Sequence, residues 1–191
     1  MRASPARRMG SDGERRLVPR TPPRDFAEVY DEHVWQVYGF FAYRLRSRPD
    51  AEDLTQQTFE RAMRAWGRYD PARASVQTWL VVIARNLLID HLRADRSRRE
   101  RTITDVQDDD PALVAAPDRH DLGLEPDLDR ALSELSERER ELIALRFGGD
   151  LSGPDIAELT DLTLANVQQI LSRALRRLRA SIERDRAAAV R

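Results

Sequence analysis

The chain of 191 residues contains no cysteine and no lysine, and aromatic residues make up only 6% of it. Without cysteine there are no disulfide bonds, no thiolate metal sites and no redox switch. Without lysine, all 32 basic residues are arginines. GC-rich codon usage accounts for much of this bias, but it has a physical consequence, because arginine binds phosphate through paired hydrogen bonds and stacks on flat rings.

Long apolar runs are also lacking, and none approaches the roughly 20 residues that cross a bilayer. Residues 1–24 carry arginines but no apolar core, so they do not resemble a secretory signal. The three histidines, His33, His91 and His120, lack the spacing of metal ligands. We therefore expect a cytoplasmic protein with no membrane partner, no metal and no other cofactor.

The net charge of −1 conceals a strong segregation of charge along the chain. Residues 1–24 hold seven arginines against two acids, a balance of +5. Residues 105–129 hold nine acids against one arginine, a balance of −8, and residues 173–191 hold seven arginines against two acids, again +5. Such separation indicates different partners for different segments.

Apolar side chains recur at helical spacing in three segments of the N-terminal half. The first helix follows Asp25 as N-cap, the second runs from Pro49 to about Trp66, and the third follows Ser75. The stripe of the first helix includes Tyr30, and that of the second includes Met63. These segments predict a compact three-helix bundle over residues 25–97.

The remaining segments complete an all-α prediction with two small helical domains. Residues 98–126 are rich in acids and poor in large apolar side chains, so we expect a flexible acidic linker. Residues 127–184 predict four short helices, one of them opened by a capping box from Ser136 to Glu139. Residues 1–24 are expected to be a disordered arginine- and proline-rich tail, and residues 185–191 a second tail.

The last two predicted helices outline a helix-turn-helix, a motif that places its second helix in the DNA major groove. Ser152 and Asp155 form a capping box at the first helix, and Thr163 caps the second. Apolar positions of the second helix, among them Val167 and Leu175, form its inner stripe. Polar and basic residues share its outer face. The alternative is a packed helical hairpin with a solvated charged face.

Two other surfaces are candidates for binding. The second helix is acidic and rich in amides around Phe59, which suits a protein partner with arginines. The third helix and the loop before it form a basic edge that fits a nucleic-acid backbone and a flipped base. An ordinary solvated surface explains either face equally well. Trp79 lies on an apolar stripe, where core packing is favoured over base stacking.

Catalysis has little support in this sequence. There is no glycine-rich phosphate loop and no Ser-His-Asp or Cys-His set. The run Asp108–Asp110 is a weak metal candidate, because consecutive acids point in different directions. We predict no catalytic residues and no enzyme activity.

Two stretches of the chain resemble a known family. Asp50-Ala-Glu-Asp-Leu-Thr-Gln-Gln-Thr-Phe59 and Trp79-Leu-Val-Val-Ile-Ala-Arg-Asn86 resemble region two of RNA polymerase sigma factors. Leu135-Ser-Glu-Arg-Glu-Arg-Glu-Leu-Ile-Ala-Leu-Arg-Phe147 and Ile156-Ala-Glu-Leu159 resemble region four. With both regions in order and no third region between them, the chain is similar to the extracytoplasmic-function (ECF) group. The resemblance covers residues 25–182.

The resemblance implies partners and sites. Core RNA polymerase, through its largest and second-largest subunits, is the expected protein partner, promoter DNA the expected nucleic acid, and an anti-sigma protein a further partner that the family allows. Core polymerase would bind Asp50, Glu52, Asp53, Gln56, Gln57, Phe59 and Glu60. The minus-ten element would contact Tyr69, Arg73, Arg85, Asn86, Asp90, Arg93 and Arg96. The minus-thirty-five element would contact Thr163, Ala165, Asn166, Gln168, Gln169, Arg173, Arg176 and Arg177.

The chain departs from the family pattern in the helix-turn-helix. Asp161 stands where the family usually has glycine in the turn. Gln168 and Ile170 replace two positions that are usually basic, so phosphate attraction at the front of the helix is weaker. Because glutamine and asparagine can read adenine bidentately, we expect the chain to use an unusual minus-thirty-five sequence.

Two other functions remain open at this point. An autonomous helix-turn-helix regulator would use its N-terminal bundle to sense a ligand or to dimerise, and would not need the Asp50–Phe59 face. An enzyme acting on nucleic acid would need the linker acids or the histidines assembled into a metal site.

Overall fold

The computed structural model describes residues 25–45, 47–105 and 125–189. Every regular element in these ranges is helical, as expected: α1 (Phe26–Ala42), α2 (Arg48–Ala65), η1 (Trp66–Arg68), α3 (Val76–Asp105), α4 (Pro126–Ser133), α5 (Glu137–Ile143), η2 (Ala144–Gly148), α6 (Gly153–Thr160) and α7 (Leu164–Ala189). Within them, no helix combines the length and apolar character needed to cross a membrane. The tail predicted for residues 1–24, the Asp108–Asp110 run and most of the predicted linker lie outside the described residues.

Hydrogen bonds at the helix ends confirm the capping residues expected from the sequence. The Asp25 side chain accepts a backbone hydrogen bond at the start of α1. Reciprocal capping boxes open α5 between Ser136 and Glu139 and α6 between Ser152 and Asp155. Because each box satisfies backbone N–H groups that have no partner inside the helix, these short helices have defined starting points.

The third helix is longer than the sequence indicated. Residue 98 is the predicted start of the linker, but α3 continues to Asp105. Its 30 residues correspond to a rod about 45 Å long. Arginine and glutamate are good helix formers, and an ion pair of 3.3 Å between Arg98 and Asp95 lies along the extension. High polarity in this segment is therefore compatible with a continued helix as well as with a linker.

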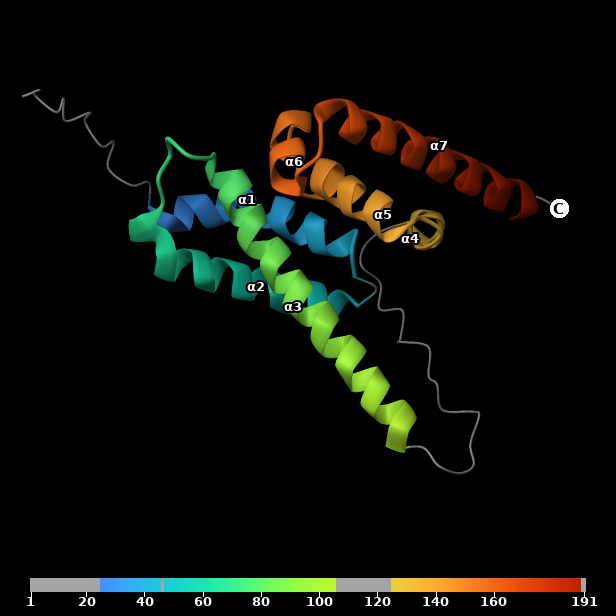
Figure 1. Ribbon diagram of the computed structural model, residues 1–191, viewed down its shortest axis with the longest axis horizontal. Helices are drawn as coiled ribbons and strands as arrows, with labels where there is room; N and C mark the ends of the chain where they lie inside the picture. Colours follow the sequence, from blue (N-terminus) through green and yellow to red (C-terminus); the bar gives the residue numbers. More distant parts are fainter. Residues whose placement is uncertain (1–24, 46, 106–124, 190–191) are drawn as a thin grey trace, which may run out of the picture.

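Helices α1, α2 and α3 form an N-terminal bundle, and α4 to α7 form a C-terminal unit (Figure 1). Phe41, Leu54 and Leu80 are buried in the core of the bundle. Helix α1 lies between α2 on one side and the helices of the C-terminal unit on the other (Figure 1). Its side chains are therefore buried on two sides, and Phe40, which lies off the predicted stripe, is fully buried.

The two helical units pack against each other through a shared buried cluster. Side chains from both units belong to the same buried cluster: Val37, Phe40, Phe41, Leu80 and Val81 from the bundle, and Leu142, Leu145, Leu151, Ile156 and Val167 from the C-terminal unit. A second cluster, which includes Ala131, Leu132, Ala174 and Leu178, joins α4, α5 and α7 within the C-terminal unit.

A π turn, η2, brings the backbones of the two units close together. The Gly149 N–H donates to the Ala144 carbonyl at 2.8 Å, a bond that spans five residues. This turn places Gly148 directly against Gly39 of α1, and a Cβ on Gly148 would lie 2.5 Å from the Gly39 backbone. Only glycine at position 148 allows the two backbones to approach this closely.

Three apolar side chains that the sequence assigned to buried stripes are exposed instead: Tyr30, Met63 and Leu175. Phe59, one of the predicted core-polymerase residues, belongs to the buried side of α2: it is 4% exposed and packs against Phe26 and Tyr30. Tyr30 and Met63 line a groove on the bundle surface. A helical period identifies an apolar face but does not distinguish a core from a groove.

Candidate partner-binding and nucleic-acid interfaces

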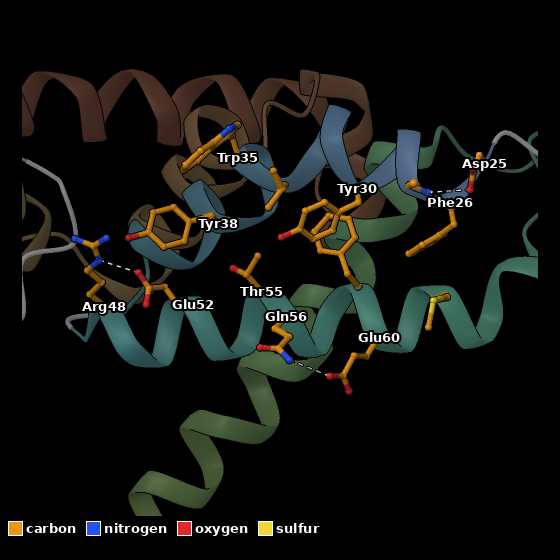
Figure 2. A pocket seen from close by; sticks show the side chains of 14 residues that line it. Asp25, Phe26, Tyr30, Trp35, Tyr38, Arg48, Glu52, Thr55, Gln56 and Glu60 are labelled. Carbon is orange, nitrogen blue, oxygen red and sulfur yellow. Dashed lines mark hydrogen bonds and ion pairs between the residues drawn. The ribbon is translucent and has the colours of Figure 1, made fainter.

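A groove of about 970 Å³ runs along the outer side of the N-terminal bundle between α1 and α2. Figure 2 shows Tyr30 and Tyr38 of α1 facing the α2 residues Thr55 and Gln56 across it. Phe26 and Phe59, in edge-to-face contact with ring centroids 6.4 Å apart, form part of its apolar lining. Such a groove fits an amphipathic helix of a partner, since apolar side chains can be buried along its length.

The most exposed large apolar side chain along the groove is Trp35, with 75% of its surface accessible. The sequence pattern did not identify Trp35 and Met63 as residues of a binding site, because helical periodicity indicates only which side chains face the core. Apolar residues occupy more of the α1 circumference than one buried face requires. This excess could have predicted a second, surface-exposed apolar face on the helix. Exposed aromatic and apolar residues gathered at a groove mark an interaction surface.

The predicted core-polymerase residues fall on two sides of α2. Glu52, Gln56, Phe59 and Glu60 line the groove, with Phe59 forming part of its floor. Gln57 donates to Asp53 at 2.7 Å, and Asp50 lies 3.8 Å from His91 of α3. The structure therefore separates this set into a groove-lining group and a group on the side of α2 toward α3.

Polar contacts at the groove rim leave a net negative edge. Arg48 pairs with Glu52 at 2.8 Å, and Gln56 donates to Glu60 at 3.3 Å (Figure 2). Glu60 also pairs with Arg64 at 3.6 Å. Among the residues that line the groove, the acids Asp25, Glu52 and Glu60 still outnumber the single arginine, Arg48. A partner helix with arginines beside its apolar face complements this edge.

Aromatic side chains hold the loop that follows η1. The Tyr69 ring stacks on Trp66, with centroids 5.1 Å apart and planes within 3°, and its hydroxyl donates to the Ala74 carbonyl at 2.9 Å. Trp79 lies against both rings and packs at the edge of the core, as expected. The backbone of this loop is thereby fixed, and Arg73 stands exposed on it.

The predicted minus-ten residues on α3 do not all share one environment. Asn86, Asp90 and Arg93 are exposed, and their i, i+4, i+7 spacing puts them on one helix face. Arg96 is exposed a turn further along. In contrast, Arg85 is turned to the C-terminal unit, where its Nε and Nη2 atoms lie 2.9 and 2.8 Å from Glu141 Oε1.

Helices α6 and α7 form the expected helix-turn-helix. The Thr163 hydroxyl accepts from the Asn166 N–H at 3.2 Å and caps α7. Val167 is fully buried against the rest of the unit, which turns the opposite side of α7 outward. The predicted minus-thirty-five residues are all exposed: Thr163, Ala165, Asn166, Gln168, Gln169, Arg173, Arg176 and Arg177.

The turn between α6 and α7 contains a strained residue. Asp161 adopts the left-handed conformation with φ of 53°. Its position lets the Leu162 N–H donate to the Ala157 carbonyl at 3.0 Å, a bond that closes the end of α6 as in a Schellman motif. The departure from glycine noted in the sequence is therefore compatible with the turn, at a cost in backbone energy.

Glu139 connects the capping box of α5 with α7. Its carboxylate accepts from the Ser136 hydroxyl at 2.7 Å and pairs with Arg177 at 2.8 Å. Burial raises the pKa of Glu139, but the hydrogen bonds from Ser136 and the charge of Arg177 outweigh it and hold the pKa below its ordinary value of 4.5. Arg177, a predicted DNA contact, thus has an acidic neighbour within its own unit.

Two family models match separate segments of the chain. Residues 29–98 match "Sigma-70 region 2", and residues 126–178 match "Sigma-70, region 4". The "ECF RNA polymerase sigma factor RpoE" of Cereibacter sphaeroides is 34% identical over 155 residues, covering 81% of this chain and 84% of the relative. The chain belongs to the ECF family of RNA polymerase sigma factors.

Other relatives agree with this placement. The "ECF RNA polymerase sigma factor SigM" of Bacillus subtilis is 31% identical and matches 82% of this sigma factor and 94% of its own length. The "ECF RNA polymerase sigma factor BldN" of Streptomyces coelicolor is 32% identical and matches 80% of this chain. This sigma factor spans 58% of the length of BldN.

Solved structures show the same fold. The sigma factor RpoE of Bartonella quintana, solved with the anti-sigma factor NepR, has a TM-score of 0.65 at 24% identity, covering 83% of this sigma factor and 97% of that chain. CnrH, solved with the cytosolic domain of CnrY, has a TM-score of 0.58 at 22% identity, covering 84% and 88%. The helical architecture of this sigma factor is therefore one that the family uses.

Proposed function

We propose that this sigma factor binds core RNA polymerase through the α1–α2 groove and directs it to promoters, where it helps to open the DNA. The observation that carries the proposal is the apolar, acid-rimmed groove in a chain of this family, which places Trp35 and Met63 at the surface. A protein with no partner would gain nothing from leaving such residues in water. The helical clamp of the largest polymerase subunit is the proposed occupant.

The second step is recognition and opening of the minus-ten element by α3 and the loop before it. Exposed Asn86 and Arg93 can contact bases and phosphates of a displaced strand, and Arg73 adds a charge on the ordered loop. Capture of flipped bases offsets the few kcal/mol that unstacking costs. This step uses binding energy alone, so the sigma factor needs no catalytic group and the polymerase supplies the RNA synthesis.

The third step is recognition of the minus-thirty-five element by α7. Asn166, Gln168 and Gln169 are the proposed base-reading residues, since they are exposed at the front of the helix. Arg173 and Arg176 lie further along α7 and would contact phosphates. The weak positive charge at the front of the helix favours readout by amide groups over phosphate attraction.

Reconstitution tests the proposal. The full chain is expected to co-elute with core RNA polymerase in gel filtration and to start transcription selectively from a promoter library, while binding the same DNA weakly alone. Trp35→Ala should weaken binding to core polymerase by about tenfold, as loss of an aromatic anchor does. Leu175→Ala, an exposed apolar residue outside the groove, is the control. Equal affinities of the two variants for core polymerase would assign the groove another role.

A further inference from the structure

The N-terminal tail, residues 1–24, joins the described part of the chain at the α1–α2 groove. Asp25, the first described residue, lines the groove together with Phe26, the first residue of α1. Figure 2 shows Asp25 and Phe26 at one end of the groove and Tyr38 toward the other. Arg24, the last residue of the tail, is therefore bonded directly to a residue of the groove.

The groove presents apolar surface that a partner can cover. Trp35 is 75% exposed, Met63 59% and Tyr30 44%, and all three line the groove. Burial of such side chains is favourable in proportion to the apolar area removed from water. Any segment of suitable chemistry that is held near the groove therefore tends to bind there.

Charge makes the tail complementary to the groove. Among the residues that line the groove, three acids, Asp25, Glu52 and Glu60, stand against one arginine, Arg48, a balance of −2. Residues 1–24 carry seven arginines against two acids, a balance of +5. Opposite charges attract within a screening length of about 8 Å at physiological salt, so the rim attracts arginines that come close to it.

One segment of the tail combines apolar and basic side chains. Leu17 and Val18 are the only two adjacent large aliphatic residues in residues 1–24. Arg15 and Arg16 precede them, and Arg20 follows after one proline. An apolar pair between arginines matches an apolar lining with acids at its rim. The segment Arg15–Arg20 is therefore the part of the tail that fits the groove.

The length of the tail allows this contact within one molecule. Leu17 precedes Asp25 by eight residues, which span at most about 28 Å when extended. Along α1 the groove runs from Phe26 to Tyr38, a rise of about 18 Å. The adjacent prolines at positions 22 and 23 are a turn signal, so the chain can reverse there. A tether this short gives an effective concentration on the order of millimolar, which favours the groove of the same chain over that of a second copy.

We propose that the segment Arg15–Arg20 docks on the α1–α2 groove of its own chain. Leu17 and Val18 bind the apolar lining, and the arginines lie at the acidic rim. This inference rests on the proposed function of the groove, because core polymerase then competes with the tail for one surface. With an effective concentration of about 1 mM and an intrinsic Kd of about 0.1 mM, the tail lowers the apparent affinity for core polymerase about tenfold.

Docking is measured by NMR in the full-length free chain, without polymerase. Because the chain has no cysteine, a nitroxide can be attached to Ser11→Cys, four residues before the segment. The indole N–H signal of exposed Trp35 reports on the groove. We expect the nitroxide to broaden this signal relative to the same sample after the label is reduced.

Paired variants of the tail locate the contact. Leu17→Ser with Val18→Ser should remove the broadening, because the segment loses the side chains that bind the lining. Arg15→Gln with Arg16→Gln should weaken it. Arg7→Gln with Arg8→Gln makes the same change of charge outside the segment and should leave it as in the wild type. All these residues precede α1, so the helical bundle keeps its core.

Competition is measured by titration of core RNA polymerase with each full-length chain. The double serine variant should bind core polymerase about tenfold more tightly than the wild type, because the tethered competitor is lost. The variant at Arg7 and Arg8 should match the wild type. Equal affinities of the serine variant and the wild type would show that tail and polymerase do not share the groove, which contradicts the inference.

Three results of the NMR measurement would also overturn it. Broadening that persists in the serine variant means that Leu17 and Val18 do not hold the tail. Equal loss in the two arginine pairs means attraction without a specific segment. Broadening seen only when a labelled molecule is mixed with a second copy means that the tail binds another chain. If the proposed function fails instead, the wild type does not co-elute with core polymerase, whereas the Trp35 signal of the free chain is still broadened.

Discussion

Asp161 and Asp150 adopt left-handed backbone conformations, with φ of 53° and 50°. Aspartate tolerates this region better than most residues but not as well as glycine. In the turn before α7 the cost is outweighed by the Leu162–Ala157 hydrogen bond and by packing of the two helices. The helix-turn-helix therefore keeps its shape with aspartate in its turn.

Asp161→Gly is expected to raise the free energy of unfolding by about 0.5 kcal/mol, because relief of backbone strain exceeds the added entropy of the unfolded chain. Asp161→Ala should lower it by about 1 kcal/mol, since alanine has no side chain that bonds locally in this region. Urea denaturation followed by circular dichroism measures both. A glycine variant less stable than the wild type would show that the aspartate side chain itself holds the turn.

Glu139 gives the C-terminal unit a dependence on pH. Its pKa in the folded protein lies below 4.5, so its carboxylate stabilises the fold above that pH. This contribution is lost as the pH falls through the depressed pKa of the folded state. Arg177 and Ser136 are the groups that hold the charge.

Glu139→Gln should lower the free energy of unfolding at pH 7 by about 1 kcal/mol, since it removes the charged part of a capping box and an ion pair. The difference from the wild type should shrink as the pH falls below 4.5, the ordinary value for this group. Glu134→Gln removes an exposed pair with Arg184 and should cost less than about 0.5 kcal/mol. Denaturation midpoints measured from pH 7 to pH 3 check this, and a constant difference would contradict it.

At the scale of single elements, the two ends of α7 differ in burial: its front is the proposed DNA-binding part, and its later turns pack inside the C-terminal unit. Its first turns present Asn166, Gln168 and Gln169 outward while Val167 is buried. Its later turns pack Ala174 and Leu178 against α4 and α5. Only a narrow face of this part of α7 is buried, so Ala174 and Leu178 are buried whereas Leu175 is exposed. Packing of Ala174 and Leu178 against α4 and α5 thus holds the N-terminal part of α7, the proposed DNA-binding part, in place.

Replacement of the two glutamines should change promoter choice without changing the fold. Gln168→Ala and Gln169→Ala are each expected to cost about 1–3 kcal/mol of discrimination at one base pair, as loss of a bidentate contact does. Glu183→Ala, an exposed residue further along α7, is the control. Transcription from a library randomised in the minus-thirty-five element measures the effect. An unchanged preference would show that α7 does not read bases through these amides.

At the scale of the whole molecule, the shared core couples the two units. Burial of Leu142, Leu145 and Leu151 depends on both units being in place, because all three lie in the cluster that includes α1 and α3 side chains. Separation therefore exposes apolar surface, which costs free energy in proportion to its area. The packing of the two units is accordingly stabilised by apolar contact as well as by the Arg44–Glu137 and Arg85–Glu141 pairs.

Because the two units share a buried core, we expect them to unfold together. Differential scanning calorimetry of the wild type is expected to show one main transition, because units with a common core unfold together. Gly148→Ala should separate it into two transitions or lower its midpoint by several degrees, as overpacking costs about 1–3 kcal/mol. Gly67→Ala, with open space around the added Cβ, should leave one transition. Identical traces for the two alanine variants would show that the Gly39–Gly148 contact does not couple the units.

Local features of this protein could be predicted from the sequence alone. The all-α class, the capping boxes at Ser136 and Ser152 and the helix-turn-helix follow from interactions within a few residues, which the order of residues determines directly. The family followed from two motifs in the right order. The exposure of the proposed minus-thirty-five residues also follows from local periodicity on α7.

Tertiary structure alone decided which apolar faces meet. Helical periodicity did not show that Phe40 and Gly39 pack against η2, that Phe59 lies beneath a groove or that Trp35 stays in water. Nor did it show that Arg85 faces Glu141, 56 residues further along the chain. These contacts depend on how rigid helices fit together across long separations in sequence. That fit is set by the shapes of both surfaces at once, which no local pattern contains.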